Sequence, residues 1–339
     1  MKKINVAING FGRIGRSALK VIFLRFNKEI NLVAINDLTD PSVLAHLLKY
    51  DSNYGSTHHD IKSTKDALVI DNKKIPVLAI KDPASLPWKK LKVDIVLECT
   101  GRFTNKAGMS LHLKAGAKKV ILSAPAKGSG VKTIVLGVNA DKIKKSDNLI
   151  SNASCTTNCL APSTKVIKDA FGIQKALMTT VHSYTSTQNL VDGPHHDLRR
   201  ARAAAVNIIP TTTGAAIATT KTIPALKDKF DGMSVRVPTP VGSLCDAVYL
   251  LKKKTTVEEV NKVFKKMART SKLKGILAAS DEELVSSDII GDPHSTTIDL
   301  KNTRLIGGDL LKVISWYDNE WGYSNRLVEL AIYLSKFIK

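Results

Sequence analysis

A strand, a glycine-rich turn and a helix near the start of the chain constrain its fold more than any other feature. Residues 4–8 are mostly apolar and lead into Gly10, Gly12 and Gly15, after which apolar residues recur at helical spacing as far as Ile22. In such a turn the first glycine bends the chain, the second lets the backbone approach a pyrophosphate, and the third lets helix and strand pack closely. The helix start points its N–H groups at the same anion. The stretch therefore predicts a dinucleotide-binding unit.

An acidic residue after the next strand narrows the choice of dinucleotide. The strand 32–36 leads into Asp37, about 20 residues after Gly15, where a carboxylate can accept hydrogen bonds from the adenosine ribose hydroxyls. Its charge would repel the 2′-phosphate of NADP. NAD is therefore the expected cofactor, and the alternative is an aspartate that only caps the segment after it.

Helical and strand patterns alternate through the first half of the chain. The expected elements are helices at 42–50 and 107–115, short β-runs between 61 and 80, and strands at 93–98, 119–123 and 133–139. Such alternation predicts an α/β fold with a doubly wound, mostly parallel sheet whose carboxyl strand ends face a ligand.

The pattern changes in the second half, where apolar and polar residues alternate. The expected strands lie in residues 176–184, 232–238, 246–251 and 311–316. Alternation predicts a largely antiparallel sheet with helices on one face, and the long polar segment 186–207 is expected to be functional or to lie in an oligomer interface. With 339 residues the chain suits two domains. We expect a dinucleotide-binding domain at 1–153, completed by a C-terminal helix at 320–339, and a catalytic domain at 154–319.

Cys155 lies where a new helical pattern begins, between hydroxyl and amide residues. The partial positive charge of a helix start predicts a lowered thiol pKa and a nucleophilic cysteine. A small buried cysteine in a polar turn is the alternative. His182 lies on a predicted strand, and a base beside a thiol in an NAD-binding protein implies oxidation of an aldehyde through a hemithioacetal and a thioester.

Charge and cysteine usage limit the partners and the compartment. The net charge is +21, but its carriers are scattered as short lysine and arginine runs without a basic tail, which favours solvated surface over a nucleic-acid site. The four cysteines show neither zinc-ligand nor disulfide-framework spacing, so reduced thiols and no metal are expected. No apolar run is long enough for a membrane span and the N-terminus lacks signal-peptide features, so a cytoplasmic location is expected.

Motifs along the whole chain resemble those of the phosphorylating glyceraldehyde-3-phosphate dehydrogenases. They are Asn9–Arg16, Ser151–Pro162, His182–Thr185, Asn207–Ala216, Arg236–Pro240 and Trp316–Ser324. The cysteine motif is specific by itself, and the motifs occur in the family's order.

The resemblance implies roles for the site residues. Cys155 would be the nucleophile and His182 its activating acid and base. Thr185 and Arg236 would mainly hold the substrate's C3 phosphate. The residues that would mainly hold inorganic phosphate are Ser154, Thr156, Arg200, Thr213 and Gly214.

The resemblance also implies an NAD site. Asn319 would bond the nicotinamide carboxamide and Tyr323 would close over the ring, while Lys81 stands where the family often has arginine. The other residues expected at the cofactor are Gly10, Gly12, Arg13, Ile14, Gly15, Asn36, Asp37, Thr100 and Ser123.

The implied reaction is the reversible oxidative phosphorylation of glyceraldehyde 3-phosphate with NAD in glycolysis, by a homotetramer. One alternative is the same chemistry on erythrose 4-phosphate, with hydrolysis of the thioester. The alternative from another class is a basic RNA-binding or adhesion protein, which the net charge of +21 alone supports.

Overall fold

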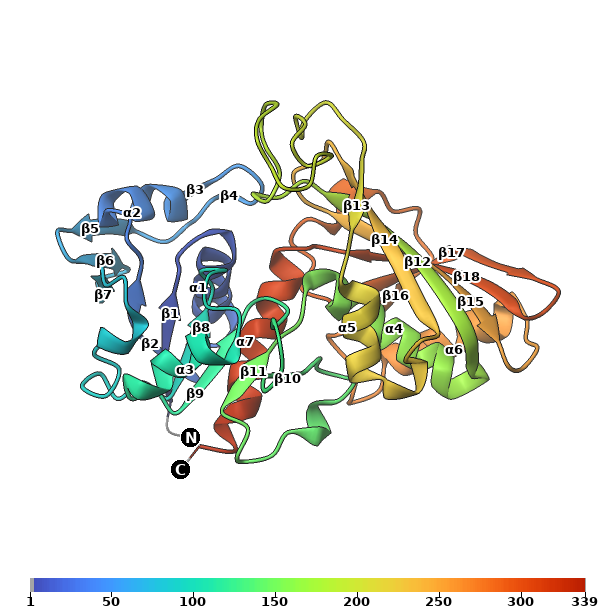
Figure 1. Cartoon of the computed structure of the whole chain (residues 1–339), viewed down its shortest axis with the longest axis horizontal. Helices are drawn as coiled ribbons and strands as arrows, with labels where there is room; N and C mark the ends of the chain where they lie inside the picture. The colour runs from blue at the N-terminus through green and yellow to red at the C-terminus, as the bar shows by residue number, and fades with distance from the viewer. Residues whose placement is uncertain (1–2, 339) are drawn as a thin grey trace. The chain divides into compact units, whose positions relative to one another are not determined.

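The computed structural model describes residues 3–338 and divides into two compact units. The first unit contains residues 1–134, 141–153 and 324–339, and the second contains 135–140 and 154–323. These units differ from the predicted domain boundaries at 135–140 and at 320–323. Figure 1 traces the chain through both units.

The first unit is built on a nine-stranded sheet in the order β10-β11-β9-β8-β1-β2-β7-β6-β5. The pairs from β10 to β7 are parallel, and β5, β6 and β7 form an antiparallel edge. The strands are β1 (Ile4–Asn9), β2 (Ile30–Asn36), β5 (Ile61–Thr64), β6 (Ala67–Ile70), β7 (Lys73–Leu78), β8 (Ile95–Glu98), β9 (Lys119–Leu122), β10 (Lys132–Thr133) and β11 (Leu149–Ser151). The predicted parallel, doubly wound sheet is confirmed.

The helices of this unit follow the sequence patterns closely. They are α1 (Arg13–Arg25), α2 (Pro41–Lys49), α3 (Lys106–Lys114) and the part of α7 (Trp321–Ser335) from Ser324 onward. A short antiparallel pair, β3 (Tyr50–Asp51) and β4 (Gly55–Ser56), and 3-10 turns at Pro83–Ser85 and Ala140–Lys142 complete the elements near this unit. The central strand β8 is buried along its whole length, as expected for a sheet covered on both faces.

The strand predicted at 133–139 is wrong beyond its first residue. Only Thr133 belongs to a strand, the two-residue edge strand β10. The backbone then turns, because Gly137 adopts a φ of 80° and the Asn139 side chain accepts a hydrogen bond from the Val135 N–H at 2.9 Å. Ile134 and Val135 are fully buried, so the apolar run reflects burial in a turn.

The second unit is built on a seven-stranded sheet in the order β13-β14-β12-β15-β18-β17-β16. Four of its strand pairs are antiparallel, while β12 with β14 and β16 with β17 are parallel. The strands are β12 (Ile173–Ser183), β13 (Ile209–Thr212), β14 (Phe230–Val237), β15 (Ser243–Leu251), β16 (Leu277–Ser280), β17 (Thr296–Ile306) and β18 (Leu310–Tyr317). The prediction of a mostly antiparallel second sheet is confirmed.

Helices pack against this sheet, and the buried residues of β15 alternate with less buried ones. The helices are α4 (Cys155–Phe171), α5 (Ala215–Thr222) and α6 (Val257–Ala268), with 3-10 turns at Pro224–Leu226 and Ser286–Ile289. Helix α4 contacts β12, β15, β17 and β18 (Figure 1). The sheet therefore buries one face under helices and leaves its other face less covered.

The segment 184–208 has neither helix nor strand. It folds back on itself, because the Asn189 N–H donates to the Arg200 carbonyl at 3.2 Å and the Gly193 N–H donates to the Ala201 carbonyl at 2.9 Å. Arg202 pairs with Asp192 at 2.9 Å. The segment is thus an internally bonded loop that leads into β13.

Candidate active site

Cys155 is the first residue of helix α4. The hydroxyl of Ser154 caps the helix by accepting from the Thr157 N–H at 3.0 Å. Ala153, which is fully buried, adopts a φ of 55°, a left-handed conformation that a residue with a side chain rarely takes. A backbone held in an unfavourable conformation is typical of functional sites, and here it directly precedes the helix that carries the thiol.

His182 near the end of β12 provides the base beside this thiol. Its Nε2 lies 3.5 Å from Cys155 Sγ, and its Nδ1 lies 2.7 Å from the Ser183 carbonyl oxygen. Because a carbonyl can only accept, Nδ1 carries the imidazole proton. Nε2 is then unprotonated and can take the proton of the thiol.

Arg236 on β14 lies on the other side of the imidazole. Its Nη1 is 3.2 Å from His182 Nδ1 and donates to the Ser183 carbonyl at 3.0 Å and to Thr185 Oγ1 at 3.2 Å. Burial, reinforced by this cation, lowers the pKa of His182 to about 3. The imidazole is therefore neutral at physiological pH.

The pKa of the Cys155 thiol differs from the expectation drawn from its helix position. Burial raises this pKa above its ordinary value, and the charge of Arg236 only partly opposes the effect. The predicted lowering is wrong, because the start of α4 is enclosed and loss of solvent outweighs the favourable charges. The resting pair is a neutral thiol beside a neutral imidazole.

The arginine predicted for phosphate binding is held by the end of β13, the strand that leads to Thr213. Arg200 donates from Nε to Thr211 Oγ1 at 2.9 Å and from Nη2 to the Thr212 carbonyl at 3.2 Å. Its positive charge contributes to lowering the pKa of both His182 and Arg236. The two neighbouring candidates differ, since Arg199 reaches the Pro210 carbonyl and Arg202 pairs with Asp192. These contacts favour Arg200 among the three.

Thr213 and Gly214 precede helix α5. Thr213 Oγ1 accepts from the Ala215 N–H at 3.2 Å, and Gly214 is the residue before the first helical turn. A Cβ on Gly214 would meet no atom within 4 Å, so open space lies over this helix start. Backbone N–H groups at such a position suit an anion.

Tyr317, at the end of β18, is a buried residue of the site to which the sequence analysis gave no role. Its hydroxyl lies 2.9 Å from both Thr156 Oγ1 and Thr180 Oγ1, and its ring meets the edge of His182 with the centroids 5.9 Å apart. The signal for it was present, because Tyr317 lies inside the motif Trp316–Ser324.

Asn319 is held with a defined orientation. Its Oδ1 accepts from the Gly242 N–H at 3.1 Å and from the Ser243 hydroxyl at 3.0 Å. The amide NH₂ is therefore the end that remains to recognise a carboxamide oxygen. Ser243 also accepts from the Ser183 N–H at 3.1 Å, so it links the histidine strand to Asn319. Tyr323, predicted to close over the nicotinamide, is buried in the first turn of α7.

The glycine turn of the first unit fits a dinucleotide. Gly10 has a φ of +90°, and a Cβ on Gly15 would lie 2.2 Å from the Gly10 carbonyl oxygen. A Cβ on Gly12 would meet nothing within 4 Å, and no side chain caps the helix that starts at Arg13. Open space over a helix start that no side chain caps is what a pyrophosphate requires. Ile14 lies in the same helical turn.

Asp37 contacts this turn directly. Its Oδ2 accepts from the Phe11 N–H at 2.7 Å and its Oδ1 accepts from the Thr39 N–H at 2.9 Å. Arg13 turns its side chain to Asp51 at 3.0 Å, so its expected contribution to the cofactor rests on its backbone. The Asp37 carboxylate thus braces the turn and keeps acceptor capacity for ribose hydroxyls.

Four other predicted cofactor residues lie around the carboxyl ends of the strands. The Asn36 amide is committed to Asn9 Oδ1 at 2.7 Å and to both backbone groups of Ile80, next to the exposed Lys81. Thr100 donates from its N–H to Glu98 at 2.8 Å and packs on Gly10. Ser123 bonds to Cys99, whose pKa burial raises to about 12. The hydrogen bonds of Asn36 and Thr100 therefore stabilise the carboxyl ends of the strands around the site.

Two further features of residues 3–338 bear on function. No group of three or more histidine, cysteine, aspartate or glutamate side chains there is placed to hold a metal ion. None of the helices in that range is both long and apolar enough to cross a membrane.

Comparison with known proteins finds a family match for each half of the chain. Residues 4–106 match the family described as glyceraldehyde 3-phosphate dehydrogenase, NAD binding domain, and residues 154–319 match glyceraldehyde 3-phosphate dehydrogenase, C-terminal domain. The glyceraldehyde-3-phosphate dehydrogenase of Streptomyces coelicolor is 53% identical over 332 residues, which cover 98% of each chain. Those of Geobacillus stearothermophilus and Borreliella burgdorferi are 54% identical over 333 residues and 52% identical over 339 residues, with 98% of this chain covered in both cases. The chain belongs to the glyceraldehyde-3-phosphate dehydrogenase family.

Proposed function

We propose that this chain catalyses the NAD-dependent oxidative phosphorylation of glyceraldehyde 3-phosphate, with Cys155 as nucleophile and His182 as its base. The observation that carries the proposal is the 3.5 Å approach of His182 Nε2 to Cys155 Sγ. The relatives are named glyceraldehyde-3-phosphate dehydrogenases.

The first step is attack of the thiol on the aldehyde carbon. The Cys155 Sγ–C bond forms while the thiol proton moves to His182 Nε2, because both groups are neutral beforehand. The carbonyl oxygen gains negative charge, which the Cys155 backbone N–H and the new imidazolium stabilise. The imidazolium then gives its proton to this oxygen, so that a hemithioacetal stands on Cys155 and His182 is neutral again.

Oxidation of this hemithioacetal needs a hydride acceptor, which NAD supplies when bound. His182 Nε2 accepts the hydroxyl proton as the C–H bond breaks, and the product on Cys155 is a thioester. The NH₂ group of Asn319, oriented by Gly242 and Ser243, would hold the carboxamide and so fix one ring face toward the substrate. Asp37 would bind the ribose and disfavour NADP.

Two anion sites serve the substrate phosphate and the attacking phosphate. Thr185 and Arg236 would hold the C3 phosphate, supported by the 3.2 Å bond that joins them. Ser154, Thr156, Arg200, Thr213 and Gly214 would hold the inorganic phosphate that attacks the thioester. Hydroxyls and a guanidinium give the charge-assisted hydrogen bonds that a phosphate requires.

The proposed substrate and acyl acceptor are tested by following NADH formation. Glyceraldehyde 3-phosphate should support turnover only when inorganic phosphate is present. A rate that does not change when phosphate is withheld, or a higher kcat/KM with erythrose 4-phosphate, would contradict the assignment and favour the hydrolytic alternative.

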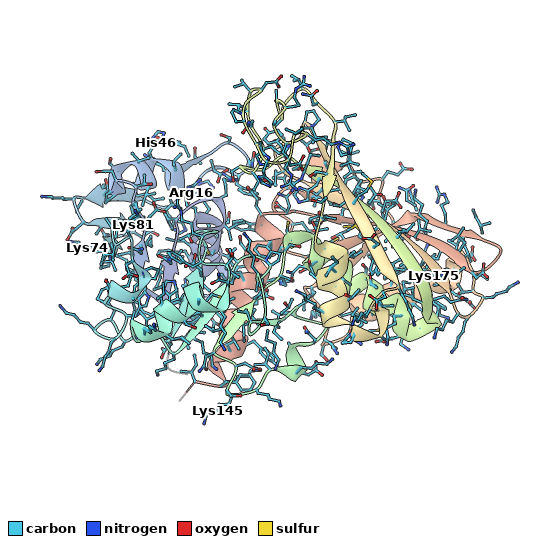
Figure 2. The ribbon with its side chains drawn as sticks, in the orientation of Figure 1. Arg16, His46, Lys74, Lys81, Lys145 and Lys175 are labelled. Atoms are coloured by element: carbon cyan, nitrogen blue, oxygen red, sulfur yellow. The ribbon has the colours of Figure 1, made fainter. Side chains whose placement is uncertain are left out.

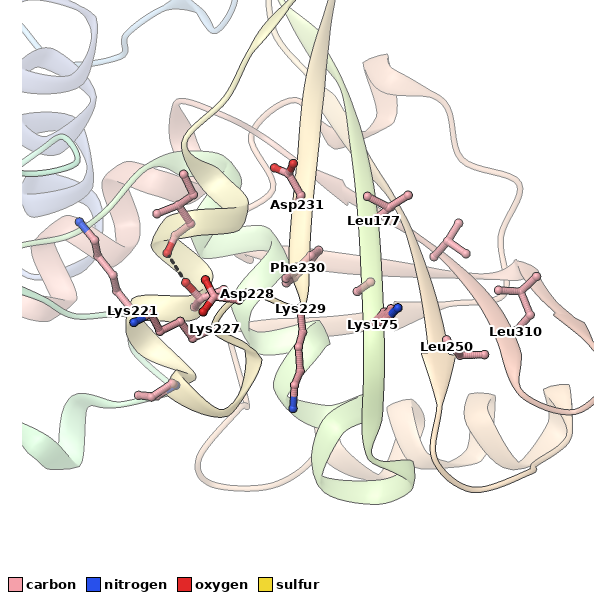
Figure 3. Close-up of a pocket in the computed structure, with 15 residues that line it drawn as sticks. Lys175, Leu177, Lys221, Lys227, Asp228, Lys229, Phe230, Asp231, Leu250 and Leu310 are labelled. Carbon is pink, nitrogen blue, oxygen red and sulfur yellow. Dashed lines mark hydrogen bonds between the residues drawn. The ribbon is translucent and has the colours of Figure 1, made fainter.

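We also propose a homotetramer, in which the less covered face of the second sheet meets another copy of the chain. A groove of 1140 Å³ lies on the unit that contains this sheet, with Leu177, Leu250 and Leu310 on neighbouring strands (Figure 3). Leu177 is 66% exposed, and Leu198 in the loop 184–208 is 80% exposed. Apolar side chains gathered in one groove, as Leu177, Leu250 and Leu310 are, suit an interaction surface.

The basic surface and the thiols bear on partners and compartment. Figure 2 labels Lys74 and Lys145 near opposite edges of the nine-stranded sheet, an arrangement that suits dispersed charge better than one nucleic-acid site. The four cysteines at 99, 155, 159 and 245 are all free. A site that depends on a free thiol suits the reducing cytoplasm, where we propose that the protein acts.

A further inference from the structure

A chain of three hydroxyl groups lies directly behind the nucleophile. Thr156 on α4, Tyr317 on β18 and Thr180 on β12 are joined in that order by two hydrogen bonds of 2.9 Å each. The chain ends on a backbone carbonyl, since Thr180 Oγ1 lies 3.0 Å from the Leu244 oxygen. The three side chains are buried, so the hydroxyls satisfy one another.

We call Thr156, Tyr317 and Thr180 the hydroxyl relay. The Leu244 carbonyl at its end determines which hydroxyl donates in each of its hydrogen bonds. A carbonyl oxygen can only accept, so the single proton of Thr180 points at Leu244. Thr180 Oγ1 must then accept from Tyr317, and Tyr317 in turn must accept from Thr156. Burial raises the pKa of Tyr317 well above its ordinary value, so its proton stays in place.

The relay leaves Thr156 with no proton for a ligand and with lone pairs, one of which can accept from the Cys155 thiol at 4.0 Å. Thr156 is one of the residues proposed to hold inorganic phosphate. At neutral pH inorganic phosphate carries at least one P–OH group, which can donate to a lone pair, whereas sulfate carries none. An anion oxygen without a proton would be repelled by Thr156 or would require the relay to reverse, which costs one hydrogen bond.

We propose that Tyr317 and Thr180 are positioning residues that make Thr156 a hydrogen-bond acceptor and thereby select hydrogenphosphate over sulfate at the inorganic phosphate site. This inference rests on the proposed role of Thr156 as a phosphate ligand. The selection acts through Thr156, because neither Tyr317 nor Thr180 is itself proposed to touch the anion.

The test measures the KM for inorganic phosphate and the inhibition constant of sulfate competing with it. Saturating glyceraldehyde 3-phosphate keeps the substrate's own anion site filled. In Thr180→Val the Tyr317 proton can turn only to Thr156, and in Tyr317→Phe the acceptor for the Thr156 proton is gone. Both variants leave Thr156 free to donate, so sulfate should inhibit about three- to tenfold more tightly while the phosphate KM changes less.

Matched controls come from a second buried threonine–tyrosine pair in the same unit. Thr164 Oγ1 lies 2.9 Å from the Tyr249 hydroxyl, and both residues are fully buried. Thr164→Val and Tyr249→Phe should leave the ratio of the sulfate inhibition constant to the phosphate KM at its wild-type value. A change of equal size in the controls would show a general packing effect and would overturn the inference.

Thr156→Val separates this inference from the role on which it rests. If that variant alters neither the phosphate KM nor sulfate inhibition, Thr156 is not a ligand and the proposed anion site is wrong. A second outcome is that Thr156→Val raises the phosphate KM while Thr180→Val and Tyr317→Phe keep the wild-type ratio of the sulfate inhibition constant to the phosphate KM. Thr156 is then a phosphate ligand, but the hydroxyl relay does not select phosphate over sulfate. In the double variant Thr156→Val with Thr180→Val, the second change should add nothing.

Discussion

Nη1 of Arg236 lies 3.2 Å from Nδ1 of His182, on the imidazole nitrogen that does not face Cys155. Burial, reinforced by this cation, keeps the imidazole neutral. The cation also opposes the rise in the thiol pKa, but burial prevails there. The proton therefore stays on the Cys155 sulfur until the substrate is attacked, and His182 becomes charged only during that attack.

The first prediction concerns the pH dependence of thiol alkylation in the cofactor-free protein. Because the pKa of Cys155 is raised and that of His182 is lowered to about 3, no thiolate–imidazolium pair forms near neutrality. The rate of reaction with iodoacetamide should rise about tenfold per pH unit from pH 6 to 9 without a plateau. A plateau between pH 6 and 7 would show that the ion pair exists.

A variant of Arg236 tests the cause of that profile. Arg236→Leu removes the cation that favours the thiolate, so the alkylation curve should move to higher pH. Arg202→Leu is the matched control, because Arg202 pairs with Asp192 in the loop 184–208 and should leave the curve in place. An unchanged curve in Arg236→Leu would show that its charge does not act on Cys155.

Asp37 should decide between NAD and NADP. Asp37→Asn removes the charge that repels a 2′-phosphate but retains an oxygen for the Phe11 N–H. The kcat/KM with NADP relative to NAD should rise about tenfold. Asp40→Asn, which alters the cap of helix α2, should leave the ratio unchanged. If the kcat/KM with NADP relative to NAD does not change in Asp37→Asn, Asp37 only stabilises the glycine turn.

Ser243 should affect the affinity for NAD through Asn319. Ser243→Ala removes a hydroxyl that donates to Asn319 Oδ1 at 3.0 Å, so the amide becomes freer to turn. The KM for NAD should rise about three- to tenfold, with a smaller change in the KM for phosphate. Ser234→Ala is a matched control, since Ser234 Oγ is buried without a hydrogen-bond partner in residues 3–338. Equal effects of the two variants would contradict the orienting role.

The less covered face of the second sheet should control assembly. Leu177→Asp places a charge on the groove between copies, so light scattering should report fewer than four chains per particle at low concentration. Leu24→Asp, at a residue 62% exposed on α1, is the control and should retain the wild-type mass. A four-chain particle for Leu177→Asp would place the interface elsewhere.

The sequence predicted the fold well because its patterns record local geometry. The glycine turn at Gly10 requires a positive φ, and the alternation along β15 records a sheet with one covered face. The error at 133–139 has the same origin, because burial makes a turn as apolar as a strand. The turn is closed by Gly137, by the Asn139 side chain and by the N–H groups of Val138 and Asn139, which donate to the Val135 carbonyl.

The electrostatics of the site could not be predicted in the same way. The position of Cys155 at a helix start was correctly expected, but the sign of its pKa shift depends on how completely the folded chain excludes water there. Tyr317 and Ser243 act through residues that are distant in sequence, and such contacts follow from packing across strands.

The central claim is that Cys155 carries an acyl thioester that inorganic phosphate discharges. Mass spectrometry of the protein mixed with glyceraldehyde 3-phosphate and NAD in phosphate-free buffer tests it directly. We predict one phosphoglyceroyl group on the peptide that contains Cys155, its loss when phosphate is added, and no adduct in Cys155→Ser. An adduct on another residue, or turnover without any adduct while Cys155→Ser stays active, would contradict the account.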